Sequence, residues 1–482
     1  MYSWKGIGST SLLVALLAPS AFIMSCSSGS PGSTSNPLGA ASGTAPVLFT
    51  VSDAPLANIL AASVTLSSVT LSTGTAGSAV SVLTHPATIE LSSLAGIQEP
   101  LELQNIAAAT YTAATVTVSA AQVTYLNASG VVTTNAASIS QPTITVALSP
   151  AMTVASSGEV HLDLGFNLAN SFDLTGTTLT FTPAISTAAA AVSAEGGGDR
   201  QLEVVGSIVS VSANTIVVQG MDSGNQITYA IDSATVLPAG VPLTSLAVGS
   251  IVQLQAQIQA DGTLLALSIT PQSSVSMSNQ SGNSSGGGDG LIVSVTSAGG
   301  QVTGFTMVPR EHFDGSTAVT LAVTLSPSTV YAIDQDALAL GLTSAQFTSA
   351  ELFPGQSVSV SGTNTGGTVA ATQVTLSAES LSGTLAAMPA GTSSSLTFSL
   401  ALPAGSYLTT YDALTSLDVV TGTATSYDHQ LTATMFAALP AATSVEIHGY
   451  LLQTAPGIFT LYAENVGQPQ PPETPEAPEG GG

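Results

Sequence analysis

The chain has 482 residues, of which only 6% are charged, and 44% are hydrophobic. Its formal net charge is −25, with 28 acidic residues against three basic ones, so a polyanion would be repelled and would release almost no counterions on binding. This balance argues against nucleic acids, anionic polysaccharides and anionic lipid headgroups as partners, and the length suggests about three or four domains.

Residues 1–25 have the parts of an export signal. Lys5 gives a positive start, and the apolar run Ser11–Met24 is too short to be a stable membrane span. The segment ends in the letters IMSC at Cys26, which resembles the bacterial lipobox, where cleavage precedes the cysteine and its thiol takes a diacylglycerol. Cys26 is the only cysteine of the chain, so it is the expected lipid attachment point rather than part of a disulfide. The alternative is an ordinary secretory signal with an incidental cysteine.

The expected lipid anchor indicates the cellular location of the protein. A lipoprotein carries two or three acyl chains, which suffice for stable anchoring. Ser27, and not Asp, follows the cysteine, which favours the outer membrane. We therefore expect a lipid-anchored protein of the bacterial cell envelope, held off the membrane by a flexible tether over residues 26–46 that is rich in Ser, Gly and Pro.

Residues 47–186 are predicted to form a β-sandwich. Apolar and polar residues alternate with a period of two, as in His161–Leu168, where every second residue is apolar. The phase of this alternation slips at Ser67-Ser68, which predicts a β-bulge. About eight to ten short strands separated by turns favour a sandwich.

Four stretches of this domain resemble the bacterial domain-of-unknown-function family 4382. They are VSDAPLANILAASVTLSSVTLS (Val51–Ser72), TYTAATVTV (Thr110–Val118), LDLGFNLANSF (Leu162–Phe172) and the closing Phe181–Pro183. Ala109 stands where the family usually has a glycine. The resemblance implies a secreted protein or lipoprotein, and it implies no reaction.

Three segments are predicted to be unfolded spacers. Residues 187–201, which include the letters EGGGDR, are expected to be a linker, and residues 272–288 a linker rich in Gly and Ser. Residues 467–482 form a Pro-rich tail with nothing apolar to bury.

Between these spacers the chain contains a degenerate repeat, over residues 202–271, 289–378 and 379–466. Each unit offers about five strands, and a helix is expected over Thr343–Glu351 with a capping box at Thr343 and Gln346. Three strands, a helix and two strands are the order of a small OB-like barrel, so we expect an all-β chain of one sandwich and two or three barrels. The first two units resemble domain-of-unknown-function family 5666, and the third is the least regular.

The candidate metal ligands are few. His161 and Asp163 lie two apart on one face of a predicted strand and could supply two ligands, although an exposed strand face is the simpler interpretation. Asp334 and Asp336 could coordinate Ca²⁺, but the other ligands and the glycine of an EF-hand loop are missing. No cofactor is expected.

Other polar residues also stand out. Charge concentrates in the segment REHFDG that begins at Arg310 and includes His312. A functional loop is one interpretation, and a surface loop whose charges pair with each other is the simpler one. Asp53, before Ala-Pro, is expected to cap a turn. In the third repeat, Glu446 and His448 share a strand face that we expect to be exposed.

No phosphate loop, dinucleotide fingerprint or nucleophile–base pair appears in the sequence. We therefore expect a non-catalytic lipoprotein that acts as a surface binding, adhesion or scaffolding protein. One alternative is a glycan- or wall-binding protein, which would need an aromatic-lined groove or a calcium site. The other is a hydrolase whose histidines and carboxylates meet between modules. The expected partners are the membrane, through the anchor, and an envelope protein or glycan; the sequence leaves the oligomeric state open.

Overall fold

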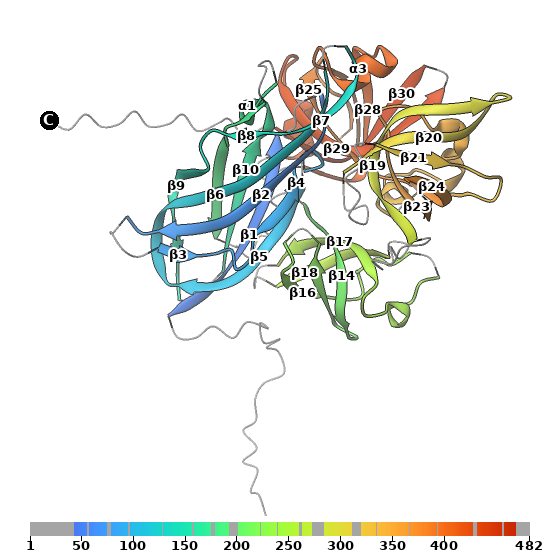
Figure 1. The fold of residues 1–482 in the computed structure, drawn as a ribbon. Coiled ribbons are helices and arrows are strands. Elements are labelled where there is room, and N and C mark those ends of the chain that lie inside the picture. Colours follow the sequence, from blue (N-terminus) through green and yellow to red (C-terminus); the bar gives the residue numbers. More distant parts are fainter. Residues whose placement is uncertain are drawn as a thin grey trace, which may run out of the picture. The chain divides into compact units, whose positions relative to one another are not determined.

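The structure is a computed structural model, shown in Figure 1, that describes residues 43–468 with internal gaps. The gaps are 55–56, 75–78, 95–96, 128, 157–158, 175–178, 192–200, 222, 239, 260–262, 272–283, 311–319, 334, 366, 393, 428–430 and 456. The predicted signal peptide, Cys26 and the tail after residue 468 lie outside the described residues. Among the described residues, no helix has the length and apolar character needed to cross a membrane.

The first domain consists mainly of two sheets that face each other. The first sheet has the order β13-β10-β1-β5 in this domain and contains β1 (Thr44–Ala54), β5 (Ile97–Ala107), β10 (Val160–Asn167) and β13 (Ile185–Ala191). It continues beyond the domain through a short parallel pairing of β5 with β14 (Gln201–Val211). The second, called the β2 sheet, contains β2 (Ile59–Ser72), β3 (Ala79–Ser81), β4 (Ala87–Glu90), β6 (Ala109–Leu126), β7 (Val132–Ala136) and β9 (Thr143–Val154). Short elements complete the domain: β8 (Ser138–Ile139), α1 (Leu168–Ser171), β11 (Phe172–Asp173) and β12 (Thr180–Phe181).

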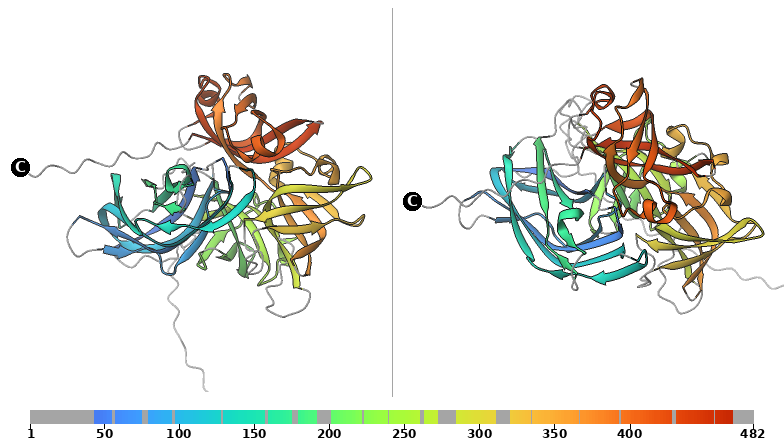
Figure 2. Two further views of the ribbon diagram at one scale, coloured as in Figure 1. Left: turned by 45° about the horizontal axis from the view of Figure 1, so that its top comes forward. Right: turned by 90° about the horizontal axis from the view of Figure 1, so that it is seen from above.

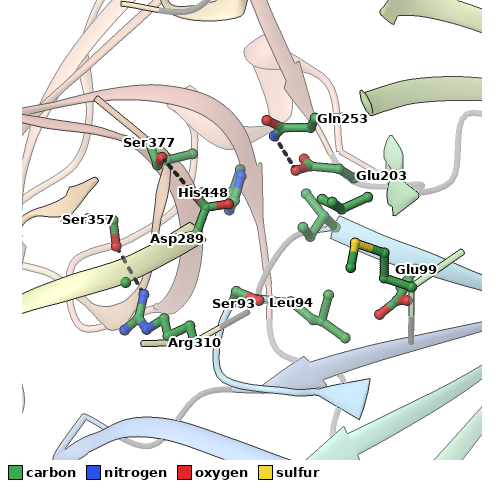
Figure 3. A pocket seen from close by; sticks show the side chains of 15 residues that line it. Ser93, Leu94, Glu99, Glu203, Gln253, Asp289, Arg310, Ser357, Ser377 and His448 are labelled. Atoms are coloured by element: carbon green, nitrogen blue, oxygen red, sulfur yellow. Dashed lines mark hydrogen bonds between the residues drawn. The ribbon is translucent and has the colours of Figure 1, made fainter. Parts of the chain in front are cut away.

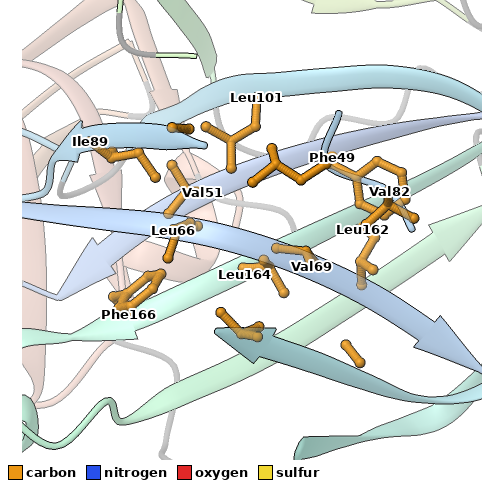
Figure 4. Close-up of a cluster of buried hydrophobic side chains, with 14 of the residues drawn as sticks. Phe49, Val51, Leu66, Val69, Val82, Ile89, Leu101, Leu162, Leu164 and Phe166 are labelled. Carbon is orange, nitrogen blue, oxygen red and sulfur yellow. The ribbon is translucent and has the colours of Figure 1, made fainter. Parts of the chain in front are cut away.

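The core of the sandwich follows from the period-two alternation. The alternating apolar residues Leu162, Leu164 and Phe166 of β10 belong to one buried cluster with Phe49 and Leu66 (Figure 4). The register between β2 and β6 shifts between Leu66 and Ser68, so the predicted bulge is confirmed. The predicted sandwich is thus present, and its first strand begins at Thr44, inside the expected tether.

The second half of the chain forms closed five-stranded barrels (Figure 2). Barrel 1 contains β14 (Gln201–Val211), β15 (Thr215–Gly220), β16 (Gln226–Ala230), η1 (Leu243–Ser245), β17 (Ile251–Ile258) and β18 (Leu264–Pro271). Barrel 2 contains β19 (Ser284–Ala298), β20 (Gln301–Pro309), β21 (Leu321–Thr324), β22 (Val330–Ile333), α2 (Gln335–Ala339), η2 (Ser344–Gln346), η3 (Ser349–Glu351), β23 (Ser357–Thr365) and β24 (Thr368–Leu376). Barrel 3 contains β25 (Glu379–Leu385), β26 (Ala390–Thr392), β27 (Ser395–Ala401), α3 (Tyr407–Asp412), β28 (Ser416–Tyr427), α4 (Ala433–Ala437), β29 (Ser444–Ala455) and β30 (Ile458–Gly467).

The barrels share one topology. Their closed orders are β14-β15-β16-β18-β17, β19-β20-β21-β24-β23 and β25-β27-β28-β30-β29, each joined back to its first strand. In each closed ring of five strands one pair is parallel, namely β16 with β18, β21 with β24 and β28 with β30. In barrel 2 the additional strand β22 also pairs in parallel with β24, outside the ring. The order of the ring is that of an OB-like barrel, so the expected fold class is confirmed, and the irregular third repeat has the same order as the others.

The expected helix over Thr343–Glu351 is instead two separate 3₁₀ turns, η2 and η3. The capping box of Thr343 and Gln346 is present, and Thr348 and Glu351 form a second one. Phe347 interrupts the helix because its backbone is extended and its side chain is buried in the barrel core.

Some core clusters extend beyond a single module. Leu48 and Leu103 of the sandwich pack with the core of barrel 1. Leu60 and Leu126, from the β2 sheet, belong to the cluster of barrel 3. One face of each sandwich sheet is therefore partly covered by a barrel, which buries polar groups that alternation alone would leave exposed.

Candidate functional site

The most concentrated group of buried charges surrounds Arg310, which follows the last residue of β20. Its main-chain N–H donates to the carbonyl of Asp289 at 3.0 Å, which fixes the start of the side chain. The side chain is only 5% exposed, and that of its partner Glu379 is fully buried. The surface loop that the sequence favours is therefore wrong for Arg310, while His312 lies outside the described residues.

The guanidinium of Arg310 donates hydrogen bonds to residues of the sandwich, barrel 2 and barrel 3. Its Nε donates to the carbonyl of Leu60 in β2 at 2.7 Å. One terminal nitrogen donates to both carboxylate oxygens of Glu379, at 3.0 and 3.1 Å, and to the hydroxyl of Ser357 at 3.1 Å. Ser357 in turn donates to Glu379. We call this group, together with Glu90, the Arg310 joint.

The charge states at the joint follow from its burial. Burial alone would lower the pKa of Arg310, but the neighbouring Glu379 and Tyr407 outweigh this and raise it. Burial raises the pKa of Glu90, and the charge of Arg310 acts in the opposite direction. The Glu90 carboxylate also accepts hydrogen bonds from the main-chain N–H of Ala62 at 2.6 Å and from the hydroxyl of Ser92 at 2.7 Å. Arg310 is thus a permanent cation whose position is fixed by acceptors on several elements.

His448 of β29 lies next to the joint and is 4% exposed, so the expected exposed face is wrong. Its Nδ1 is 2.9 Å from the hydroxyl of Ser380, which donates its proton to the carbonyl of Ser93 at 2.7 Å. Because that proton is used, His448 Nδ1 must be the donor to Ser380. Burial and the charge of Arg310 lower the pKa of His448 to about 4, so the ring is neutral at pH 7.

A cavity of about 70 Å³ with both charged and apolar side chains in its lining lies against the joint (Figure 3). Its lining includes Arg310, His448 and the acidic residues Glu99, Glu203 and Asp289. Glu203 accepts from the amide of Gln253, and Asp289 accepts from Ser377 at 3.1 Å. A water molecule needs ~10–15 Å³ of such space and small-molecule pockets measure ~300–1,000 Å³, so the cavity suits a few waters and not an organic substrate.

A second buried network joins β10 to the neighbouring strand β1. It contains His161 and Asp163 of β10. Thr50 donates to one carboxylate oxygen of Asp163 at 2.7 Å, and Ser52 donates to the other at 2.6 Å. The Thr50 oxygen is also 2.8 Å from His161 Nε2 and therefore accepts from it. His161 and Asp163 are 4% and 3% exposed, so the expected exposed face is wrong; the adjoining Leu48 packs under barrel 1.

The structure places the remaining candidates apart from these clusters. Asp53 is buried near the end of β1, in register with Phe166. Asp336 of α2 accepts a 3.4 Å hydrogen bond from Ser268 of barrel 1, and burial raises its pKa to about 6. Asp334 is not among the described residues. Within the described ranges, no three His, Cys, Asp or Glu residues are grouped so that they could hold a metal ion.

Sequence reasoning missed most of the joint. Glu90, Ser357 and Glu379 stand in ordinary strand patterns, and nothing in their local sequence shows that distant strands cover them. The one available signal was the rarity of basic residues. Arg310 is one of only two Lys or Arg residues after Cys26, so many carboxylates are possible partners for it, and a buried ion pair is plausible on that count alone.

The chemistry available to the Arg310 joint and to the His161 network is limited by which groups their hydroxyl protons are donated to. Neither Ser380 nor Thr50 is hydrogen-bonded to a histidine nitrogen that could accept its proton, because each hydroxyl already donates elsewhere. A general base would have to accept that proton to activate the hydroxyl as a nucleophile. The geometry therefore suits structural linkage of the modules.

Comparison with known proteins adds two family matches. The family described as "Domain of unknown function (DUF4382)" matches residues 44–183, and "Domain of unknown function (DUF5666)" matches residues 205–270. No curated protein matches the chain.

Solved structures with some similarity share little sequence with this chain. A single-stranded DNA binding protein from Thermus aquaticus has 13% identity and a TM-score of 0.17, covering 42% of this chain and 98% of its own. The Drosophila protein Unr CSD456 has 12% identity and a TM-score of 0.14, with coverages of 56% and 97%. A Streptococcus pneumoniae protein with nucleic acid binding domains has 10% identity and a TM-score of 0.11, with coverages of 54% and 73%. TM-scores this low support no transfer of nucleic acid binding. By its family matches, the chain carries a DUF4382 domain at residues 44–183 followed by a DUF5666 domain at residues 205–270.

Proposed function

We propose that this chain is a lipid-anchored, non-catalytic protein of the bacterial cell envelope that serves as a binding or scaffolding protein. The lipobox-like ending at the unique Cys26 supports the anchor and its location. The non-catalytic part rests on one observation, the Arg310 joint. The most concentrated buried charges of the described chain are used to hold three modules together, and the adjacent cavity is too small for an organic substrate.

A hydrolase is the alternative that one contact favours, the 2.9 Å pair of Ser380 and His448. Three features oppose it. The hydroxyl proton of Ser380 goes to the carbonyl of Ser93, His448 Nδ1 is then already protonated, and both side chains are buried. A serine hydrolase needs an accessible hydroxyl whose proton the histidine can accept. Reaction of the native protein with a fluorophosphonate probe at Ser380 would revive this alternative.

Metabolic labelling with a palmitate analogue tests the proposed anchor. Wild-type protein is expected to be labelled and to sediment with membranes. Cys26→Ala is expected to lose the label and to appear in the soluble fraction, while Ser27→Ala is a matched control that keeps both. A Cys26→Ala protein that remains labelled and membrane-bound would contradict the proposal.

A further inference from the structure

A third polar group lies where the sandwich contacts barrel 1. Thr84 and His85 lie between β3 and β4, Glu102 belongs to β5, and Asn225 directly precedes β16. The hydroxyl oxygen of Thr84 is 2.8 Å from Glu102 Oε2, 3.1 Å from Asn225 Oδ1 and 3.0 Å from His85 Nδ1. His85 Nδ1 is also 3.4 Å from Asn225 Oδ1. Four side-chain atoms from three separate parts of the chain therefore converge, and we call these four residues the Thr84 group.

Other contacts hold the oxygen atoms of the group in place. Asn225 Nδ2 donates to the carbonyl of Leu101 at 2.9 Å, so the amide oxygen, and not the amide nitrogen, faces Thr84. The main-chain N–H of Thr84 donates to Glu102 Oε2 at 3.2 Å, which positions the carboxylate. Glu102 and Asn225 are only 8% and 7% exposed, whereas Thr84 and His85 are exposed. The group thus has a buried floor and a side that is open to solvent, through which an ion can enter.

The Thr84 group has more lone pairs than protons. The hydroxyl of Thr84 has one proton, which it can donate to Glu102 or to Asn225 but not to both, and His85 Nδ1 carries at most one more. Arg310 is the only Lys or Arg in the described ranges, and it is bound at the joint, so no described basic side chain neutralises Glu102. An arrangement of this kind is suited to a cation.

The spacing of the four atoms fits a single metal ion. Ligand atoms ~2.1 Å from a metal are ~3.0 Å apart in octahedral coordination and ~3.4 Å apart in tetrahedral coordination. The four separations in the Thr84 group, from 2.8 to 3.4 Å, lie close to these values. Hydrogen-bonded atoms are spaced similarly, so the feature that distinguishes the group is one hydroxyl proton that faces three atoms able to accept it.

We propose that Thr84, His85, Glu102 and Asn225 bind a divalent transition-metal ion such as Zn²⁺. The imidazole nitrogen favours Zn²⁺ over Ca²⁺ and Mg²⁺, which prefer ligand sets made only of oxygen. The group has one histidine and one acid, and an amide and a hydroxyl supply its other ligands, so it differs from the sites of three His, Cys, Asp or Glu that the described ranges lack. Because Asn225 comes from barrel 1 and the other ligands come from the sandwich, the ion links the two domains. This inference goes beyond the proposed function and does not depend on the lipid anchor.

Isothermal titration calorimetry of Zn²⁺ into the metal-free mature full chain tests this. Excess Ca²⁺ at physiological ionic strength occupies the other carboxylates, and every protein carries Cys26→Ala so that a free thiol does not bind zinc. The protein with no other substitution should bind one Zn²⁺ in the presence of Ca²⁺. His85→Ala and Glu102→Gln should each raise the Kd at least about tenfold, since loss of a residue that only supports a ligand already costs ~10–100-fold. Zn²⁺ should also raise the melting temperature of the unsubstituted protein more than that of either variant.

The matched control is Asp418→Asn, which removes an exposed carboxylate in barrel 3 and should leave the Kd for Zn²⁺ unchanged. Far-UV circular dichroism without metal checks that each variant folds; His85→Ala changes an exposed side chain, so it reports on the site even if Glu102→Gln misfolds. The inference is overturned by the absence of saturable Zn²⁺ binding, by an unchanged Kd in His85→Ala, or by an equal loss of affinity in Asp418→Asn. None of these results bears on the palmitate labelling of Cys26, so failure here is distinct from failure of the anchor.

Discussion

Arg310 shows how a single residue can constrain the arrangement of a large chain that has very few basic residues. A buried cation is costly unless it is paired and its donors are satisfied. Here Glu379, Ser357 and the carbonyl of Leu60 satisfy the guanidinium from different elements. The joint can therefore form only when these elements meet in one arrangement, so the ion pair gives specificity to the packing of modules.

Glu379→Gln tests this directly, because it keeps the side-chain shape but removes the carboxylate that forms the salt bridge with the buried Arg310. We expect a loss of about 3–5 kcal/mol in the free energy of unfolding, measured by urea titration with far-UV circular dichroism. Asp418→Asn, at an exposed site in β28, is the matched control and should change stability by less than about 0.5 kcal/mol. Equal urea midpoints for Glu379→Gln and wild type would show that the joint carries no such energy.

The burial of His448 predicts that the free energy of unfolding depends on pH in a specific way. Burial and then Arg310 lower its pKa to about 4 in the fold, whereas an unfolded histidine has a pKa of about 6.5. Above pH 6.5 both states are neutral and the stability is fully present. As the pH falls to about 4, only the unfolded state gains a proton, so about 3 kcal/mol is lost.

Comparing wild type with His448→Asn isolates this effect, since asparagine can still donate to Ser380. The difference in melting temperature between pH 7 and pH 4.5 should be smaller in the variant. Buried acids such as Glu90, whose pKa is raised, act in the opposite direction in both proteins and cancel in the comparison. Identical pH profiles would mean that His448 is not buried as a neutral ring.

At the scale of the element, the fourth strand of each barrel has a common irregularity. β17, β23 and β29 each shift register against the next strand just before Ala256, Gly362 and Gly449, respectively, and β29 shifts a second time between Gln453 and Ala455. Each is the last residue of a short segment that recurs in the three units, as Val252–Ala256, Val358–Gly362 and Val445–Gly449. The repeat therefore encodes a β-bulge, and a small residue is needed where the bulged strand approaches its neighbour.

Gly449→Ala should destabilise barrel 3, because a Cβ there would lie 2.2 Å from the carbonyl oxygen of Tyr462. We expect a loss of about 1–3 kcal/mol, measured as a lower urea midpoint. In barrel 1 the equivalent residue is already alanine, so Ala256→Gly should cost no more than about 1 kcal/mol. A Gly449→Ala protein as stable as wild type would contradict the close approach of β29 and β30.

Across the whole molecule, alternation and repetition in the sequence predict the sandwich and the strand order of the barrels, since both depend on local periodicity. They do not predict which outward faces become covered. His161, Asp163 and His448 all occupy outward positions in their strands, and each is buried because another module or a distant strand packs there. The partners of Arg310 are separated by up to 250 residues, so no local pattern identifies them.

Limited trypsin digestion of the mature protein tests the joint most directly, because Arg200 and Arg310 are the only basic residues after Cys26. Mass spectrometry of the fragments reports each site separately, and digestion in urea shows that both can be cut. In the folded wild type we predict that cleavage after Arg310 occurs only as fast as the chain unfolds, and that it accelerates in Glu379→Gln. Cleavage after Arg310 in the folded wild type at the rate of the unfolded chain would contradict a buried Arg310 joint.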